Sequence, residues 1–278
     1  MLRKFYKMHG IGNDYIYFDC LQEELKKPEE LSIRLSDRHT GVGGDGIVMI
    51  CSSDVADAKM RMFNADGSEG MMCGNAIRCV GKFLYDFDKI KKTTLTIETL
   101  SGIKTLQLTV KEGKVTEVEV DMGAPILEGK AIPTTIDKRE IVAYPYNFIG
   151  EYEEITCVSM GNPHCIIFKD PDELHLEKIG PIYENAPIFP KRVNTEFVKV
   201  VKRNEVKMRV WERGSGETRA CGTGACAVAV ASVLNGYADR NAEIIVHLLG
   251  GDLMIRWTDE TVFMKGSATL AFIGEVEI

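Results

Sequence analysis

The sequence predicts an α/β protein of two pseudo-symmetric domains, each a strongly curved mixed β-sheet wrapped around a central helix. Three observations lead to this prediction. The first is an internal repeat at a nearly constant spacing. The second is a series of short alternating or β-branched runs in each half, which is typical of strands. The third is one principal helix in each half, which begins directly after a Cys-Gly pair.

The repeat is clearest around the two Cys-Gly pairs. Cys73-Gly74 and Cys221-Gly222 are 148 positions apart (221 − 73 = 148). Other matches keep this order and nearly this spacing: Arg61 with Arg209, Phe63 with Trp211, Glu69 with Glu217, Gly102 with Gly250, and Gly12-Asn13 with Gly161-Asn162. Because several pairs recur in one order, we infer two copies of one folding unit.

The expected strands follow the chain in two matching series. In the first half they are 5–8, 15–18, 47–50, 59–63, 95–98, 105–110 and 115–121. In the second half they are 155–159, 165–168, 196–200, 206–211, 243–247, 253–257 and 262–265. Each run has the length or the two-residue alternation of a strand. The two series therefore predict two similar sheets.

The two expected helices differ in character. The first carries apolar residues at helical spacing from Ala76 to Phe87, which indicates one buried stripe. The second, from Ala225 to Leu234, is apolar nearly all round and ends at Asn235-Gly236, a good helix stop. A helix that is apolar on all sides must be surrounded, and we expect curved sheet to surround it.

These elements predict a domain division. The first domain is expected to comprise residues 1–122 plus 268–278, and the second to comprise residues 123–267. The proline-containing stretch 123–150 is expected to form the crossing between the halves. Two copies of one unit usually face each other, so the active site is expected in the cleft between the domains.

Composition narrows the class of protein. The formal net charge of −7 argues against nucleic acid as a partner, because phosphate binding normally needs a basic face. The N-terminal segment does not resemble a signal peptide, and no apolar run is long enough for a membrane span. We therefore expect a cytoplasmic protein that does not bind a membrane. Eight cysteines without a CxxC pair, and five scattered histidines, predict no metal site.

Cys73 and Cys221 are the candidate chemical groups. Each is expected at a helix N-terminus, where unpaired backbone N–H groups favour the thiolate. Inversion of a stereocentre removes a proton from one face and delivers another to the opposite face, which two thiols on opposite walls can perform as base and acid. The two thiols would titrate as a coupled pair. The other six cysteines are interpreted as structural: Cys20, Cys51, Cys79, Cys157, Cys165 and Cys226.

The helix starts also offer a solution to the weak acidity of an α-proton. The N–H groups around Gly74-Asn75 and Gly222-Thr223 are placed to bind a substrate α-carboxylate from both sides. Developing negative charge then meets preorganised dipoles in a site shielded from water. This chemistry needs neither pyridoxal phosphate nor a metal, so no cofactor is expected.

Four segments carry a resemblance that covers nearly the whole chain. Residues 64–78, NADGSEGMMCGNAIR, and 211–225, WERGSGETRACGTGA, are similar to the two signature segments of the diaminopimelate epimerase family. FYKMHGIGND at residues 5–14 and GNPH at 161–164 resemble its other recurrent segments. The resemblance implies interconversion of LL- and meso-2,6-diaminoheptanedioate, on the route to lysine and to bacterial cell-wall precursors, by a homodimer.

The resemblance also implies roles for individual residues. Cys73 and Cys221 are implied to be the acid and base, with His164 and Glu212 assisting their proton transfers. The substrate-binding set that it implies is Asn13, Asn64, Gly74, Asn75, Asn162, Asn194, Glu212, Arg213, Gly222 and Thr223. Arg213 can hold the far carboxylate of the substrate bidentately, while asparagine amides donate and accept hydrogen bonds.

The sequence departs from the family pattern at two positions. Many members have glutamine where Gly46 stands, which puts one substrate contact in doubt. Many also have a tyrosine, linked to dimer formation, where Phe272 stands. The second departure puts a hydroxyl contact in doubt rather than dimerisation itself.

Three alternatives stay open from the sequence. A proline or hydroxyproline racemase on the same architecture would not need a far-end clamp, which Arg213 and four asparagines argue for. A phenazine-biosynthesis-like isomerase shares the fold but lacks the cysteine pair. A non-catalytic amino-acid-binding protein would bind the ligand without exchanging its α-proton with solvent.

Overall fold

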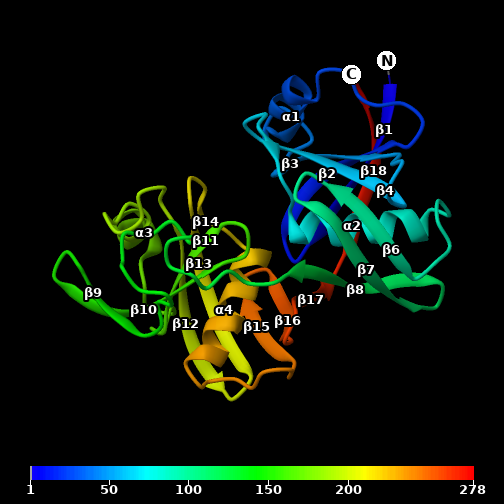
Figure 1. The fold of residues 1–278 in the computed structure, drawn as a ribbon. Helices are drawn as coiled ribbons and strands as arrows, with labels where there is room; N and C mark the ends of the chain where they lie inside the picture. The colour runs from blue at the N-terminus through cyan, green and yellow to red at the C-terminus, as the bar shows by residue number, and fades with distance from the viewer. Residues whose placement is uncertain (1) are drawn as a thin grey trace. The chain divides into compact units, whose positions relative to one another are not determined.

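A computed structural model describes residues 2–278 (Figure 1). The chain divides into two compact units, Met1–Asp121 with Lys265–Ile278, and Met122–Met264. These limits lie one residue and three residues from the limits expected from the sequence (122 − 121 = 1 and 268 − 265 = 3). The first unit therefore contains both ends of the chain, and the second is one continuous segment.

The first unit contains nine strands and two helices among its described residues. In chain order they are β1 (Leu2–Gly10), β2 (Asn13–Cys20), α1 (Pro28–Ser36), β3 (Gly46–Cys51), β4 (Ala58–Asn64), β5 (Glu69–Gly70), α2 (Gly74–Asp86), β6 (Thr94–Thr99), β7 (Gly102–Lys111), β8 (Lys114–Gly123) and β18 (Thr269–Glu277).

The second unit repeats this order, except that its outer strand comes first in the chain rather than last. Its elements are β9 (Tyr144–Phe148), β10 (Glu151–Ser159), β11 (Pro163–Ile167), α3 (Leu176–Glu184), β12 (Asn194–Lys202), β13 (Glu205–Glu212), β14 (Gly216–Glu217), α4 (Gly222–Leu234), β15 (Ile244–Leu248), β16 (Gly251–Trp257) and β17 (Val262–Ser267). All fourteen strands expected from the sequence are found, with ends that differ by a few residues.

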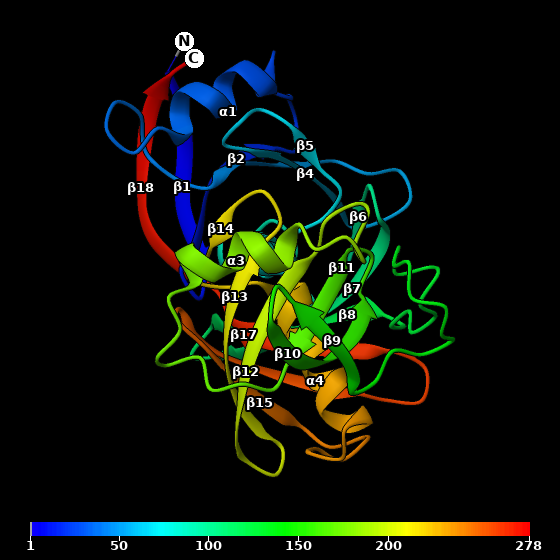
Figure 2. The ribbon, with the colours of Figure 1, turned by 90° about the vertical axis from the view of Figure 1, so that its left-hand side faces the viewer.

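The strand pairing repeats between the units. β2 pairs with β3 in parallel, and β3 with β4 antiparallel, as β11 pairs with β12 and β12 with β13. β4 pairs with β6 in parallel, as β13 does with β15. An antiparallel outer strand is added in each unit, β18 on β1 and β9 on β10. Figure 2 shows β18 running beside β1. The predicted duplicated architecture of mixed sheets is therefore confirmed.

Even single contacts recur at the repeat spacing. Phe63 lies opposite Glu69 in the first unit, and Trp211 lies opposite Glu217 in the second. The matching ion pairs are Arg61 Nε to Glu69 Oε1 at 2.8 Å, and Arg209 Nε to Glu217 Oε1 at 2.7 Å. Each ion pair joins the strand before the cysteine to the short strand that leads into it. The same turn is thereby held in both units.

Each unit packs its sheet around one helix. α2 contacts β1, β2 and β7, and it buries the apolar stripe that begins at Ala76. α4 contacts β10, β11, β12, β15 and β16, and it is buried from Gly222 to Ser232 except at Thr223. Strands from both ends of the sheet thus touch one helix, which requires a curved sheet. This confirms the central helices that the sequence predicts.

Several elements were not expected from the sequence. α1 and α3 give each unit a second helix, although one principal helix was predicted for each half. α1 begins with Pro28 and two glutamates, a helix-start signal that the strand pattern obscured. α3 contains Pro181, which argues against a helix in sequence reasoning. β9 lies inside the stretch expected to be only a crossing, and β5 and β14 have two residues each.

Among residues 2–278, no helix is both long and apolar enough to cross a bilayer. The same residues contain no group of three or more histidine, cysteine, aspartate or glutamate side chains arranged to hold a metal ion.

The structure explains why glycine stands at position 46. Gly46 opens β3 with a φ of 153°, and a Cβ there would lie 2.0 Å from the backbone oxygen of Phe63. The same Cβ would lie 2.8 Å from the ring of Tyr15. A glutamine, which the family resemblance places here, therefore requires a different local backbone.

Gly46→Ala is expected to destabilise the fold by about 2 kcal/mol more than Gly102→Ala, because it adds a backbone clash to the strain of a positive φ. Gly102 is the matched control, since its φ is 98° and a Cβ there meets nothing within 4 Å. Urea unfolding of both variants measures the difference. Equal losses of stability would show that the clash relaxes without cost.

Candidate active site

Cys73 is the N-cap residue of α2. Its backbone is extended, with φ −133° and ψ 119°, and Ala76 N donates to its sulfur over 3.5 Å. The thiol is partly buried and donates to Asn13 Oδ1 over 3.3 Å. The sulfur therefore lies against the first turn of the helix, where unpaired N–H groups favour a negative charge.

A charged network holds Asn13 beside Cys73. Asp45 Oδ2 accepts from Asn13 Nδ2 over 2.7 Å, and Arg38 bridges Asp45 and Asp14 at 2.9 and 2.7 Å. Lys7 Nζ adds a contact of 2.6 Å to Asp14. Burial raises the pKa of Asp14, but hydrogen bonds from Arg38 and Lys7 outweigh it and leave the pKa lowered. This network was not predicted, because its members are spread over four separate segments of the sequence.

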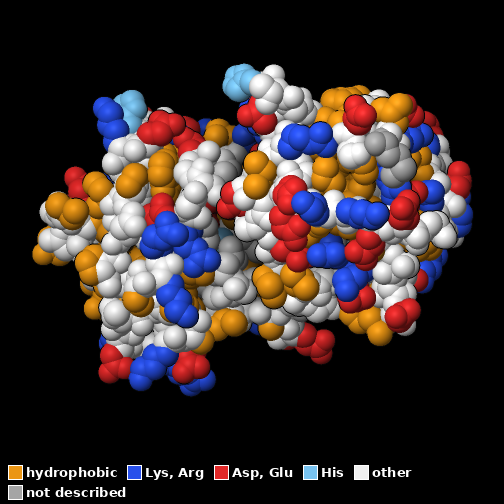
Figure 3. Space-filling view, turned by 90° about the horizontal axis from the view of Figure 1, so that it is seen from above, with side chains coloured by type: hydrophobic (Ala, Val, Ile, Leu, Met, Phe, Trp, Pro, Cys, Tyr) orange, Lys and Arg blue, Asp and Glu red, His pale blue; other side chains and the backbone are white. Residues whose placement is uncertain are grey.

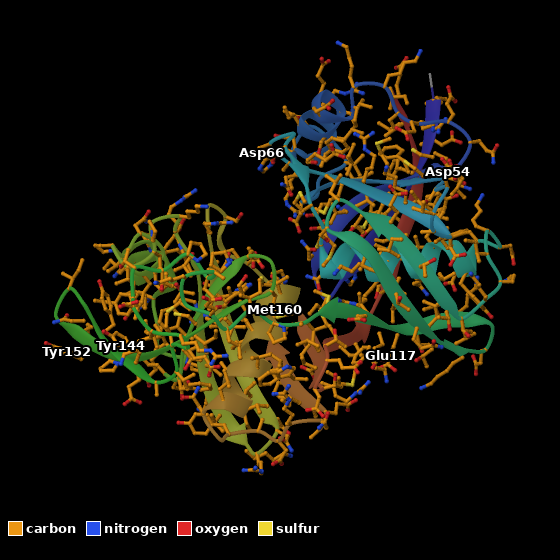
Figure 4. The ribbon with its side chains drawn as sticks, in the orientation of Figure 1. Asp54, Asp66, Glu117, Tyr144, Tyr152 and Met160 are labelled. Carbon is orange, nitrogen blue, oxygen red and sulfur yellow. The ribbon has the colours of Figure 1, made fainter. Side chains whose placement is uncertain are left out.

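The other predicted residues of the first unit lie close to these elements. Gly74 and Asn75 form the start of α2, and both are buried. Asn64 ends β4 opposite Gly46, and its Nδ2 donates to Ser68 Oγ over 3.0 Å. Asp66, labelled in Figure 4, marks the turn that follows Asn64 and leads towards Cys73.

Cys221 is the N-cap residue of α4, with φ −116° and ψ 106°. Its sulfur is buried and lies 3.5 Å from Thr223 Oγ1. Burial raises the pKa of Cys221 well above its usual value, and the negative charges of Glu212 and Glu196 raise it further. Hydrogen bonds from Thr223 and the Gly224 N–H offset this only in part. The protonated form of Cys221 is therefore favoured more strongly than that of an exposed cysteine.

A buried hydrogen-bonded chain leads from β12 to Cys221. His164 is fully buried, and its Nδ1 lies 2.6 Å from Glu196 Oε1. His164 Nε2 lies 3.1 Å from Asn162 Oδ1, and Asn162 Nδ2 donates to Thr223 Oγ1 over 3.3 Å. In Figure 4, Met160 marks the turn before Asn162. His164 and Asn162 were predicted, whereas Glu196, an acidic residue in the buried first half of β12, was missed.

Glu212 lies at the end of β13 beside the cysteine. Thr218 Oγ1 donates to Glu212 Oε1. Burial raises the pKa of Glu212, while hydrogen bonds from Thr218 and Cys221 and the charge of His164 lower it in part. A carboxyl group with a raised pKa next to a thiol is suited to accept and return a proton.

Asn194 and Arg213 form the outer part of this region. Asn194 Nδ2 donates to Pro163 O over 2.8 Å, and its Oδ1 accepts from Arg213 N over 2.9 Å. The guanidinium of Arg213 donates to Lys191 O over 3.1 Å. Asn194 thus fixes the backbone of Arg213, whose side chain stays partly exposed.

The second unit therefore gathers Cys221, His164, Asn162, Thr223 and Glu212, and the first gathers Cys73 with Asn13. The sequence profile of diaminopimelate epimerase matches residues 5–128 and 156–271. The chain belongs to the diaminopimelate epimerase family. The epimerase predicted from the sequence, an isomerase with a small-molecule substrate, is confirmed by this assignment.

Relatives agree over the full length. A diaminopimelate epimerase of Methanococcus maripaludis is 55% identical over 285 residues, which cover 99% of this chain and 100% of the relative. One from Acetivibrio thermocellus is 55% identical over 278 residues, which cover 99% of each chain.

Solved structures share the fold at low sequence identity. A probable proline racemase from Agrobacterium radiobacter superposes with a TM-score of 0.74 at 13% identity, covering 99% of this chain and 93% of the other. A phenazine biosynthesis protein from Bacillus anthracis superposes with a TM-score of 0.73 at 17% identity over 100% of both chains. These two show the fold alone, and the family assignment makes a proline-racemase activity less favoured.

Glu212→Gln is expected to lower the pKa of Cys221, because the substitution removes a negative charge that opposes formation of the thiolate. Alkylation of Cys221 by iodoacetamide, followed by peptide mass spectrometry, should therefore begin at a lower pH than in the unsubstituted protein. Alkylation of Cys73 in the same digest is the control. An unchanged or higher onset at Cys221 would contradict this electrostatic account.

Proposed function

We propose that this chain interconverts LL- and meso-2,6-diaminoheptanedioate by a two-base proton transfer, without a cofactor, on the route to lysine and to cell-wall precursors. The observation that carries the proposal is the pair of cysteines in equivalent N-cap positions of α2 and α4, within a chain of the diaminopimelate epimerase family. The names of its relatives at 55% identity supply the substrate.

In the proposed reaction the two sulfurs act on opposite faces of the substrate α-carbon. One cysteine, as thiolate, takes the α-proton, and the other, as thiol, donates a proton to the opposite face. The C–H bond electrons pass to the α-carbon and are delocalised into the carboxylate, then form the new C–H bond. In the reverse direction the two cysteines exchange roles.

The starts of the two helices complete the proposed site. The N–H groups of Gly74-Asn75 and of Gly222-Thr223 bind the α-carboxylate, since helix N-termini favour anions. Their dipoles stabilise the charge that develops as the proton leaves. Asn13, Asn64, Asn162, Asn194 and Arg213 are proposed to bind the remainder of the substrate, with Arg213 on the far carboxylate.

His164 and Glu212 are proposed to assist the thiols. Glu212 hydrogen-bonds Cys221, and its pKa is raised by burial, so it is suited to exchange a proton with that thiol. His164 reaches Cys221 through Asn162 and Thr223 rather than directly. Both groups thus act on the second cysteine.

Cys73→Ala and Cys221→Ala are each expected to lower kcat by about 10²- to 10⁴-fold, because each removes one of two proton-transfer groups. Incubation with LL-diaminopimelate in deuterated water, without added cofactor, followed by chiral analysis, measures epimerisation and α-proton exchange. Cys226→Ala, in the next turn of α4, is the matched control and should retain activity. Proline as substrate should give no exchange.

The spatial part of the same prediction is tested by oxidation. Diamide accepts two electrons and two protons from a pair of neighbouring thiols, so it should join Cys73 to Cys221 and stop turnover until reductant is added. Peptide mass spectrometry identifies the bond. Activity that survives diamide treatment, with both thiols still free, would contradict a single carbon held between them.

A cytoplasmic homodimer is proposed as the working form, with no nucleic acid or membrane as partner. Among residues 2–278, which include all eight cysteines, no disulfide is formed, which fits a reducing compartment. Acidic and basic side chains are interspersed on the face shown in Figure 3. Phe272 and Ile273 of β18 are 49% and 43% exposed, apolar surface that a second copy would cover.

The protein is expected to sediment at twice its chain mass of 31.0 kDa, and Phe272→Lys to shift it towards the monomer, because a charge would be buried at the interface. Analytical ultracentrifugation measures both masses. Leu100→Lys, at a similarly exposed apolar residue of the same unit, is the control. A monomer at micromolar concentration would contradict the proposal.

A further inference from the structure

We propose that Glu196 is a positioning residue for Cys221. It holds the ring of His164 with the protonated Nε2 directed at Asn162 Oδ1, and it thereby supports a chain of hydrogen bonds through Asn162 and Thr223 onto the Cys221 sulfur. This inference rests on the function proposed above and assigns a role to a residue outside the predicted set.

The surroundings of Glu196 are unusual for a carboxylate. Its side chain is fully buried on β12, and its Oε1 lies 2.6 Å from His164 Nδ1. Its Oε2 has no hydrogen-bond partner among residues 2–278. A Cβ added to Gly224 would lie 2.7 Å from Glu196 Oε1, so the carboxylate touches the first turn of α4. An acidic group in such a position is costly unless it is paired.

The two copies of the repeat provide an internal comparison. At the positions of His164, Glu196 and Gly224, the first copy has Tyr15, Val48 and Ala76 (164 − 15 = 149, 196 − 48 = 148, 224 − 76 = 148). All three residues of the first copy are buried and none carries a charge. Glu196 is therefore not required by the fold, and Gly224 leaves the space that its carboxylate occupies.

The hydrogen bonds of the chain run in one direction. Asn162 Nδ2 donates to Thr223 Oγ1, so its Oδ1 faces His164 Nε2, which must carry a proton to be bonded. Thr223 has then used its oxygen as an acceptor, and its own hydrogen is free to be donated to the Cys221 sulfur at 3.5 Å. Every donor in the chain therefore points towards Cys221.

The number of protons on the His164–Glu196 pair defines what Glu196 contributes. Because Nε2 of His164 carries a proton, a second proton lies between Nδ1 and Glu196 Oε1, on one atom or the other. The buried pair is then electrically neutral as a whole. The other titratable groups that act on this region are Glu212 of β13, Cys221 at α4, and Cys165 of β11 with its neighbour Cys157 of β10. Without Glu196, Nδ1 loses its partner and that edge of the ring is no longer held, so the hydrogen bond from Nε2 to Asn162 Oδ1 is weakened.

Two variants separate the hydrogen bond from the charge. Glu196→Gln and Glu196→Leu both lack the carboxylate charge, but only glutamine can donate to His164 Nδ1. The rate of Cys221 alkylation at fixed pH is expected to be roughly tenfold or more lower in E196L than in E196Q, because only E196L leaves His164 Nδ1 unpaired and so weakens the chain that holds Thr223 as a donor to the sulfur. Cys73 in the same digest should react equally in both.

Turnover provides the second measurement. With diaminopimelate, E196Q is expected to keep kcat within about tenfold of the unsubstituted protein, whereas E196L loses about a further tenfold, with KM changed less than kcat. Thr195→Val, an equally buried change on the same strand, is the control and should retain activity. Equal losses in E196Q and E196L, or no loss in either, would overturn the proposal.

The third measurement needs no variant. Nitrogen-15 NMR of the histidine rings should show His164 Nε2 protonated in the unsubstituted protein, and an unprotonated Nε2 would overturn the proposal even if E196L fails to fold. Neither NMR nor alkylation depends on turnover. An unsubstituted protein that lacks epimerase activity would therefore remove the proposed function and leave these two results to decide the role of Glu196.

Discussion

The contact between a cysteine sulfur and the first turn of the helix that follows it is the interaction on which the rest of each half-site depends. Cys73 and Cys221 both have extended backbones directly before a glycine that starts the helix. The sulfur therefore faces N–H groups that have no partner inside the helix. The same N–H groups are suited to bind a carboxylate, so one short turn brings together a thiol and N–H groups that favour an anion.

The fold holds this turn with the same parts in both units. An arginine–glutamate ion pair joins the strand before the turn to the two-residue strand that leads into it. The helix that follows is packed against strands of its own sheet, so the helix start cannot move independently of them. Burial of the helix thus fixes the position of a thiol, which links core packing to chemistry.

How much of this was predictable depends on where the information lies along the chain. The duplication, the fourteen strands and the two central helices leave local patterns of spacing and alternation, and the sequence showed them. The helices α1 and α3 were not predicted, because α1 begins among charged residues and α3 contains Pro181. β18 was missed because most of its residues are exposed, so it has no regular apolar alternation.

The candidate site divides in a similar way. Cys73, Cys221, His164 and Asn162 stand in motifs, and they were found there. Glu196 and the network of Lys7, Arg38 and Asp45 depend on pairing between strands and loops that are distant in sequence, which residue spacing does not reveal. A glutamate directly before the apolar pair Phe197-Val198 was the one local signal, since a buried acid needs a partner.

The divergence of the two halves has a chemical consequence. A two-base inversion needs one thiolate and one thiol at the same time. Two identical, independent thiols would populate such mixed states in at most about half of the molecules, split equally between the two arrangements. In this protein burial, Glu212 and Glu196 raise the pKa of Cys221, whereas Cys73 is only partly buried and lies beside Asn13. The surroundings of Cys221 thereby favour its protonated form, and Cys73 donates to Asn13 Oδ1 instead, so the two sulfurs have different partners. Duplication supplies two equivalent N-caps, and the changes at His164, Glu196 and Gly224 make their environments unequal.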